Sequence, residues 1–137
     1  WRPSFYARMT NPRQTVVIVE DHEDSRMMYV EYLRMSFDVL EAGDGQRAWE
    51  IIQETPPAVV VTDLALPRVD GYELIDRIRT DGRLRETPVV ALSGYSASDL
   101  TASGKPARWD VELLKPCLPE QLLEAIARLV SGRKSKG

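Results

Sequence analysis

The chain alternates between two patterns of apolar and polar positions. Short apolar runs are typical of strands that are covered on both faces. Between them, apolar residues recur every three or four positions, which is typical of amphipathic helices. Because the two patterns follow one another along the chain, they predict an α/β fold with a doubly wound, five-stranded parallel sheet and helices on both faces. The predicted strands are residues 15–19, 38–42, 58–62, 88–92 and 111–114, and the clear helices are residues 24–36, 45–54, 72–80 and 119–131.

The fourth helix is the least regular of the predicted elements. Residues 96–103 begin with capping residues but contain Leu100 as their one large apolar residue, and Gly104-Lys105-Pro106 follows. This composition predicts a helix that is short or irregular. The last helix is expected to end at Gly132, because glycine is common just past a helix end.

The first helix combines a polar start with several methionines. Asp24 or Ser25 is expected to cap it. Met27, Met28 and Met35 are among its apolar positions. They are therefore expected to lie in the core or close to it.

Size and charge restrict the class of protein. The chain of 137 residues is long enough for one domain, expected over residues 15–131, with a flexible lead-in over residues 1–14 and a basic tail over residues 132–137. The net charge of −3 conceals six basic residues and no acid at the two ends, and removing those six charges leaves −9 for residues 15–130. The negative net charge of residues 15–130 argues against nucleic-acid binding.

Other residues with potential chemistry have simpler interpretations. No apolar run is long enough to cross a bilayer, and the one cysteine, Cys117, excludes an internal disulfide and fits a reducing compartment. We therefore expect a cytoplasmic protein without membrane contact. Cys117, Trp49 and Trp109 are interpreted as packing residues, and His22 as an exposed loop residue rather than a metal ligand.

Charged side chains directly follow three of the predicted strands. Glu20 and Asp21 follow the first strand, Asp63 follows the third, and Lys115 follows the fifth. In an open parallel sheet, the carboxyl ends of neighbouring strands border one crevice where ligands bind. Carboxylates crowded there repel one another and attract a divalent cation, and a lysine can pair with an arriving anion. This combination predicts a site that transfers a phosphoryl group to a carboxylate.

Four separated motifs at the ends of predicted strands resemble the receiver domain of two-component response regulators. The resemblance extends from about Thr15 to Val130, and all four motifs occur in order. The motifs are Glu20-Asp21, Asp63-Leu64-Ala65-Leu66-Pro67 with Asp70-Gly71, Ala91-Leu92-Ser93-Gly94, and Lys115-Pro116.

The resemblance implies a flavodoxin-like sheet with strand order 2-1-3-4-5. It also implies that Asp63 accepts a phosphoryl group from a phosphohistidine on a histidine kinase or a histidine phosphotransfer protein. Ser93 would then hydrogen-bond the phosphoryl group, and Lys115 would pair with it. Phosphorylation would switch the binding of an output partner that the sequence does not specify.

The resemblance further implies a Mg²⁺ site. Asp21 and Asp63 would be ligands, Glu20 would lie nearby and act through water, and the backbone carbonyl of Ala65 would be a further ligand. Elementary chemistry supports these roles, because phosphoryl transfer depends mainly on positioning and charge neutralisation. Mg²⁺ suits carboxylates with phosphate oxygens, and lysine supplies a point charge. The Lys115-Pro116 bond is expected to be cis.

One position departs from the family pattern, and two others bear on the lifetime of the phosphoryl group. Receivers commonly carry an aromatic residue or histidine three residues before the lysine, where this chain has Glu112. A carboxylate enters an apolar pocket only at high cost, so we expect an altered output face. Ala65 and Tyr95 occupy the positions that influence attack by water on the phosphoryl group, and neither is an acid or amide that would orient water. The expected loss of the phosphoryl group is therefore slow, over minutes to hours.

Several interpretations remain open. Residues 87–95 are similar to receivers of hybrid histidine kinases, so the chain is either a single-domain regulator or the receiver of such a kinase. The alternative function, favoured by Glu112, is a protein-interaction module that works without phosphorylation. An aspartyl-phosphate hydrolase is disfavoured, because its second aspartate corresponds to Ala65. We expect a monomer or weak dimer that is no enzyme beyond its own phosphoryl uptake and slow hydrolysis.

Overall fold

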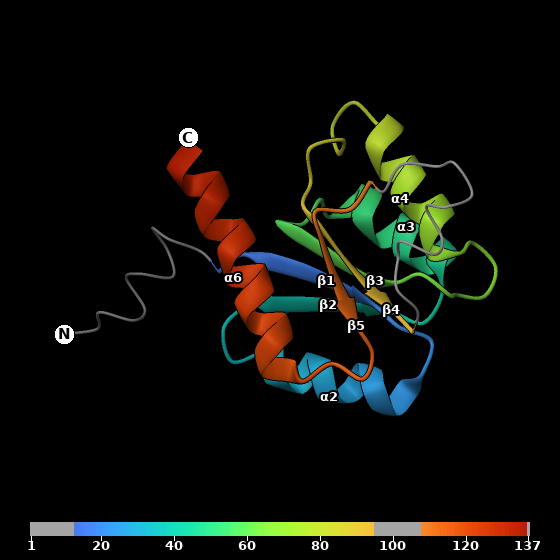
Figure 1. The fold of residues 1–137 in the computed structure, drawn as a ribbon. Helices are drawn as coiled ribbons and strands as arrows, with labels where there is room; N and C mark the ends of the chain where they lie inside the picture. The colour runs from blue at the N-terminus through green and yellow to red at the C-terminus, as the bar shows by residue number, and fades with distance from the viewer. Residues whose placement is uncertain (1–12, 95–107, 137) are drawn as a thin grey trace.

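The computed structural model describes residues 13–94 and 108–136, whose helices and strands are drawn in Figure 1. Within these two stretches, no helix has the length and apolar character needed to span a membrane. Residues 1–12, Tyr95 and the predicted fourth helix lie outside the described residues. The strands are β1 (Thr15–Val19), β2 (Asp38–Ala42), β3 (Val59–Asp63), β4 (Val89–Ser93) and β5 (Val111–Leu114), and the helices are α2 (Glu23–Leu33), α3 (Gly45–Glu54), α4 (Gly71–Thr80) and α6 (Pro119–Lys136).

The strands form one parallel sheet in the order β2-β1-β3-β4-β5. β1 pairs with two neighbours, so that Val17 lies opposite Leu40 of β2 and opposite Val60 of β3. Every residue of β3 and β4 is buried, which explains why these strands are continuous apolar runs in the sequence. The predicted doubly wound, flavodoxin-like sheet is confirmed.

Helices cover both faces of the sheet, as Figure 1 shows. α2 and α6 pack on one face, and α3 and α4 pack on the other. Successive strand residues alternate between these two layers, because side chains in a strand point to opposite faces. The expected packing roles of Cys117 in the first layer, and of Trp49 and Trp109 against the second, are confirmed. The first layer includes Ile18, Val30, Leu33, Leu122 and Ile126, and the second includes Val17, Ile52, Leu74, Ile75 and Ile78.

The ends of two helices differ from the prediction. α2 begins at Glu23 rather than after a cap at Asp24 or Ser25, and the acidic side chains of its first turn lie at the positive end of the helix dipole. α6 continues through Gly132 to Lys136, so the predicted end at Gly132 is wrong. A glycine inside a helix costs only about 1 kcal/mol, and a helix whose earlier turns are packed is already nucleated.

The methionines of α2 are not in the core, contrary to the prediction. Met27 is 49% exposed, Met28 is 43% exposed, and Met35, just beyond the helix, is 70% exposed. The buried stripe of α2 is formed by Tyr29, Val30 and Leu33 instead. Each residue advances about 100° around a helix, which turns the two preceding methionines away from that stripe.

Arg13, near the end of the predicted lead-in, contacts the segment that follows α2. Its guanidinium donates hydrogen bonds to the backbone carbonyls of Arg34 and Phe37, at the carboxyl end of α2. Carbonyl groups at this end of a helix have no partner within the helix and carry partial negative charge, so they attract a cation.

The loop after β3 packs closely against the starts of two helices. A Cβ atom on Gly71 would lie 2.3 Å from the carbonyl oxygen of Asp63 and 2.6 Å from the Cα of Leu64. A Cβ on Gly45 would lie 1.8 Å from the carbonyl oxygen of Val69. Glycine at these positions lets α3 and α4 hold the loop, and with it the carboxyl end of β3.

We expect Gly71→Ala to lower the free energy of unfolding by about 2 kcal/mol or more, because backbone atoms cannot yield to a new methyl group as side chains do. Gly82→Ala is the matched control, since a Cβ there would meet nothing within 4 Å, and it should change stability by less than about 0.5 kcal/mol. Urea denaturation of both variants measures the difference. Equal stabilities would contradict the close packing.

Candidate functional site

The carboxyl ends of four strands place polar side chains at one edge of the sheet. Asp63 is the last residue of β3, and Ser93 is the last residue of β4. Glu20 follows β1 directly, and Lys115 follows β5 directly. Because all the strands are parallel, their carboxyl ends lie at one edge, and the long Lys115 side chain after β5 reaches Glu20 after β1, 95 positions away in the sequence.

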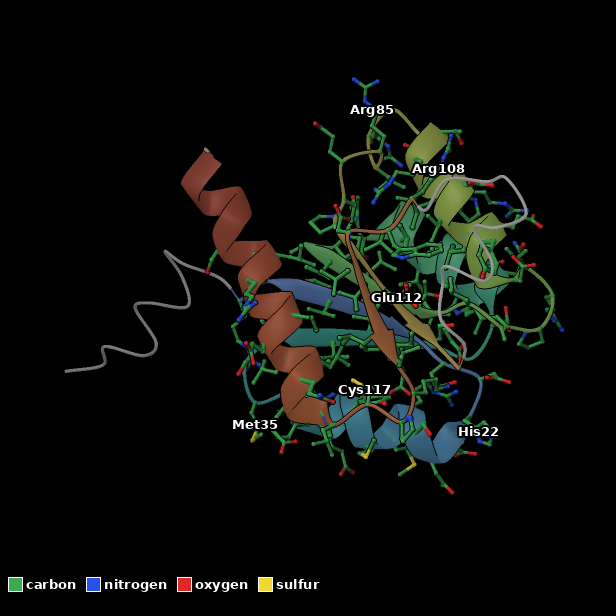
Figure 2. All side chains as sticks on the ribbon, in the orientation of Figure 1. His22, Met35, Arg85, Arg108, Glu112 and Cys117 are labelled. Atoms are coloured by element: carbon green, nitrogen blue, oxygen red, sulfur yellow. The ribbon has the colours of Figure 1, made fainter. Side chains whose placement is uncertain are left out.

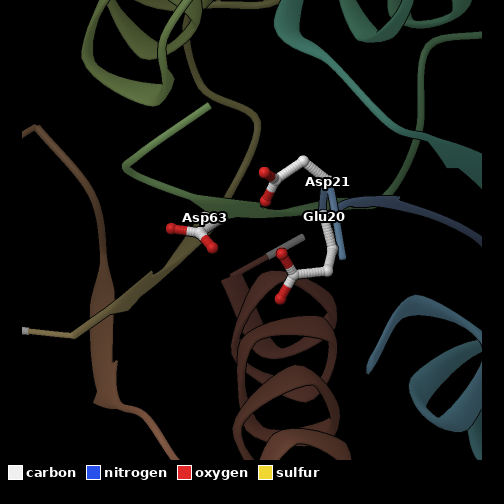
Figure 3. A group of neighbouring side chains, drawn as sticks. All are labelled: Glu20, Asp21 and Asp63. Atoms are coloured by element: carbon white, nitrogen blue, oxygen red, sulfur yellow. The ribbon is translucent and has the colours of Figure 1, made fainter. Parts of the chain in front are cut away.

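Three carboxylates gather at this edge. One oxygen from each of Glu20, Asp21 and Asp63 lies within 4.8 Å of the others, as Figure 3 illustrates. Glu20 and Asp63 are buried, whereas Asp21 is exposed. Acidic groups this close repel one another unless a cation lies between them. The donor set of carboxylate oxygens, partly open to solvent, fits a hard divalent cation such as Mg²⁺.

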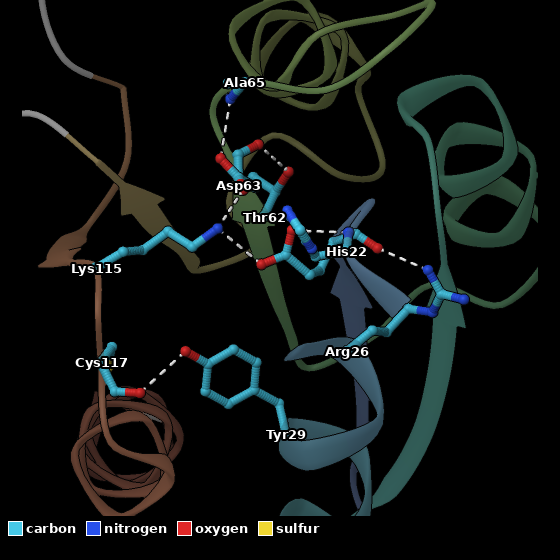
Figure 4. Close-up of polar contacts among 9 residues, drawn as sticks. His22, Arg26, Tyr29, Thr62, Asp63, Ala65, Lys115 and Cys117 are labelled. Carbon is cyan, nitrogen blue, oxygen red and sulfur yellow. Dashed lines mark hydrogen bonds and ion pairs between the residues drawn. The ribbon is translucent and has the colours of Figure 1, made fainter. Parts of the chain in front are cut away.

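The Lys115 ammonium joins two of the carboxylates. Its Nζ lies 2.6 Å from Oδ2 of Asp63 and 2.8 Å from Oε1 of Glu20, as drawn in Figure 4. Burial disfavours the charge on this lysine, but the hydrogen bonds to Asp63 and Glu20 outweigh it and raise the pKa of Lys115 above its ordinary value. The lysine is therefore held as a cation directly beside Asp63.

Glu20 is the most deeply buried acid of the site. Burial raises its pKa above the ordinary value, and the nearby charge of Asp63 raises it further. The hydrogen bond from Lys115 and a weaker one from the backbone N–H of His22, at 3.3 Å, act in the opposite direction. The His22 side chain is exposed, as expected, and it is not part of the candidate metal-binding group of Glu20, Asp21 and Asp63.

Asp63 is oriented from both sides. One carboxylate oxygen contacts Lys115, while Oδ1 accepts a hydrogen bond of 3.0 Å from the backbone N–H of Ala65. The hydroxyl of Thr62 donates to the backbone carbonyl of Asp63 at 2.9 Å. These contacts fix the carboxylate at the mouth of a pocket, where an electrophile can approach it.

The pocket beside Asp63 has a volume of about 400 Å³. Ser93 lines it and is itself buried, and a Cβ on Gly94 would meet nothing within 4 Å, so the pocket is open at that point. The backbone N–H of Lys115 donates to the Ser93 carbonyl at 2.8 Å, which ties the ends of β4 and β5 together. The lining residues are Asp63, Leu64, Ala65, Leu66, Asp70, Tyr72, Ser93, Gly94 and Lys115.

Sequence reasoning missed the two tyrosines near the site. Tyr72 lines the pocket, and its buried hydroxyl has no hydrogen-bond partner among residues 13–94 and 108–136. Burial raises the pKa of Tyr72, and the charges of Asp70 and Glu112 add to this effect. Its position just after the Asp70-Gly71 motif was the available signal. Tyr29, from α2, donates a hydrogen bond to the carbonyl of Cys117, and no motif pointed to it.

Arg26 was also missed. Its guanidinium donates to the backbone carbonyl of Glu20 at 2.8 Å and pairs with Glu41 at 3.0 Å, so it joins α2 to the ends of β1 and β2. Figure 2 shows the side chains in the orientation of Figure 1, with His22 and Glu112 labelled. Glu112 is half-buried on β5, and the predicted cis bond between Lys115 and Pro116 is observed.

Comparison with known proteins gives a consistent family. A sequence model described as "Response regulator receiver domain" matches residues 16–127. The chain is 32% identical over 122 residues to "Response regulator Rre1" of Synechocystis sp., covering 88% of this chain and 52% of that protein. It is 27% identical over 121 residues to "Histidine kinase P4" of Formosa agariphila, of which it covers 9%. The chain thus spans about half the length of the first relative and a much smaller share of the second.

Solved structures agree with this comparison. The chemotaxis response regulator CheY4 of Vibrio cholerae superposes with a TM-score of 0.78 at 26% identity, covering 85% of this chain and 98% of that one. The signal receiver domain of a signal transduction histidine kinase from Syntrophus aciditrophicus gives a TM-score of 0.78 at 26% identity, covering 87% and 91%.

We expect Glu20→Gln to raise the unfolding temperature of the metal-free protein at neutral pH. Because the folded state raises the pKa of Glu20, the ionised carboxylate destabilises the fold above that raised pKa. This penalty declines as the pH falls through the raised pKa and vanishes below the ordinary value of 4.5, so the advantage of the variant should vanish there too. Calorimetry across this pH range measures it. Glu31→Gln, at an exposed position of α2, is the control, and a lower unfolding temperature of Glu20→Gln at pH 7 would contradict the expectation.

Proposed function

Because this chain belongs to the response regulator receiver domain family, we propose that it accepts a phosphoryl group on Asp63 from a phosphohistidine. Receiver domains are signalling modules of two-component response regulators and hybrid kinases, and they partner with histidine kinases or histidine phosphotransfer proteins. The observation that carries the proposal is the contact of 2.6 Å between the Lys115 ammonium and the Asp63 carboxylate at the mouth of the pocket.

In the proposed reaction, a carboxylate oxygen of Asp63 forms a bond to phosphorus. The phosphorus–nitrogen bond to the donor histidine breaks, and its electron pair returns to the imidazole. Lys115 transfers a hydrogen bond from the carboxylate to a phosphoryl oxygen, since the carboxyl group of the new acyl phosphate no longer carries the charge with which the lysine was paired. The Ser93 hydroxyl donates to another phosphoryl oxygen, because it lines the same pocket.

The acidic cluster supports a role for Mg²⁺. Asp21 and Asp63 would hold the ion directly and Glu20 would hold it through water, with the carbonyl of Ala65 as a further ligand. When bound, the ion supplies positive charge that neutralises the oxygens of the phosphoryl group. Phosphorylation then adds a charge of about −1.5 to −2 and shifts a conformational equilibrium of the domain. Slow hydrolysis, inferred from Ala65 and Tyr95, stays a prediction.

The exposed apolar side chains support a docking site for the donor protein. All large apolar side chains that are exposed in the described part of the chain come from α2, the turn after it, the end of β5, or the connection between β5 and α6. A hydrogen bond from Tyr29 to Cys117 joins α2 to that connection. Exposed apolar side chains close to a reactive site are typical of an interaction surface. This apolar surface comprises Met27, Met28, Met35, Leu114 and Leu118.

The phosphoacceptor is tested by intact-mass measurement after incubation with acetyl phosphate and Mg²⁺. The wild type should gain the mass of one phosphoryl group, and Asp63→Asn should gain none, because an amide is not a nucleophile for this transfer. Asp70→Asn is the matched control, since Asp70 lines the same pocket and asparagine caps α4 equally well. An unmodified wild type would favour the phosphorylation-independent interaction module.

The docking site is tested with the double variant Met27→Ser/Met28→Ser. Transfer from a histidine phosphotransfer protein that phosphorylates the wild type should slow by about tenfold, as expected for loss of apolar anchors at an interface. The rate with acetyl phosphate should not change, because this small donor needs no docking surface. Equal slowing with both donors would contradict a docking role.

A further inference from the structure

The position of Lys115 depends on the connection between β5 and α6, which comprises residues 115–118. At its start, the N–H of Lys115 is bonded to the Ser93 carbonyl at 2.8 Å. At its end, the N–H of Leu118 is bonded to the side chain of Gln121 at 3.0 Å, within the first turn of α6. Between these points, Tyr29 of α2 reaches the connection: its hydroxyl donates a hydrogen bond of 3.0 Å to the carbonyl of Cys117.

Tyr29 is well suited to hold this connection. It is 2% exposed and belongs to the core between α2, α6 and the sheet, so its ring has little freedom to move. Burial raises the pKa of its hydroxyl, which therefore remains a donor at neutral pH. The charges of Lys115 and Glu20 both act on this hydroxyl, and Figure 4 shows the ring of Tyr29 below the side chain of Lys115.

The contacts of Lys115 leave little tolerance for movement of its backbone. Its Nζ makes hydrogen bonds of 2.6 Å and 2.8 Å to two carboxylates that belong to two other strand ends. Displacement of a reacting group by about 1 Å can cost two orders of magnitude in rate. A contact that fixes the connection two residues after Lys115 therefore bears on the reaction at Asp63.

We propose that Tyr29 is a positioning residue for phosphoryl transfer, whose hydroxyl holds the β5–α6 connection where Lys115 reaches Asp63 and Glu20. This inference rests on the proposed function of Asp63. It assigns to a buried residue of α2 an effect on Lys115, which follows the edge strand β5. The simpler role, filling the core, would be met equally by phenylalanine.

The test compares Tyr29→Phe with the wild type in the rate of phosphorylation by acetyl phosphate with Mg²⁺, followed by intact mass. Loss of one buried hydrogen bond should slow the reaction by about three- to tenfold. The matched control is Tyr32→Phe, one turn further along α2 and half-buried, which should react at the wild-type rate. The same comparison is made in a Lys115→Ala background, with thermal unfolding measured for every variant.

If Tyr29 acts through Lys115, Tyr29→Phe has no further effect on the rate once Lys115 is alanine, while its effect on unfolding temperature is the same in both backgrounds. Equal slowing in the two backgrounds, or no slowing in either, overturns the inference and leaves the proposed function intact. If wild-type protein acquires no phosphoryl group, the proposed function fails and the inference fails with it.

Discussion

The contact between one ammonium group and two buried carboxylates is the interaction on which the candidate site depends. Glu20 and Asp63 lie close together out of water, where their mutual repulsion is strong. Lys115, which follows β5 at the same edge of the sheet, compensates this repulsion. A lysine that is paired in this way can exchange one carboxylate for the oxygens of an arriving phosphoryl group at little cost, because its total number of charged contacts is conserved.

This arrangement requires a rigid frame, since the three groups come from three different strand ends. The frame is built by close backbone contacts and by buried hydrogen bonds rather than by the charges themselves. Gly71 lets α4 pack directly against the backbone of Asp63, and Tyr29 fastens the connection that carries Lys115 to α2. Arg26 fastens the backbone of Glu20 to α2 as well. α2 thus supports two of the three charged groups, Glu20 and Lys115.

The pocket has a second side that differs from the usual receiver pattern. Glu112 occupies the position where an aromatic residue or histidine is common, and the charge of Glu112 acts on Tyr72, which lines the pocket. Tyr72 lines the pocket from α4. Its ring lies 5.9 Å from that of Trp109, which precedes β5, in an edge-on arrangement. An aromatic side chain therefore lines the same pocket as Asp63, and it comes from a helix instead of from the edge strand.

The sequence by itself determined the fold class, the five strands to within one residue, and the identity of the charged residues at the strand ends. It could do so because strand burial and helix periodicity are local properties, and because parallel strands must bring their carboxyl ends to one edge. Only the tertiary structure decided how these residues are used. It turned Met27 and Met28 outward, carried α6 past Gly132, and placed Tyr29 against Cys117, which is 88 residues away. These outcomes depend on which helix face meets the sheet and on which backbones approach each other, and such contacts between distant segments leave no periodic signal in the chain.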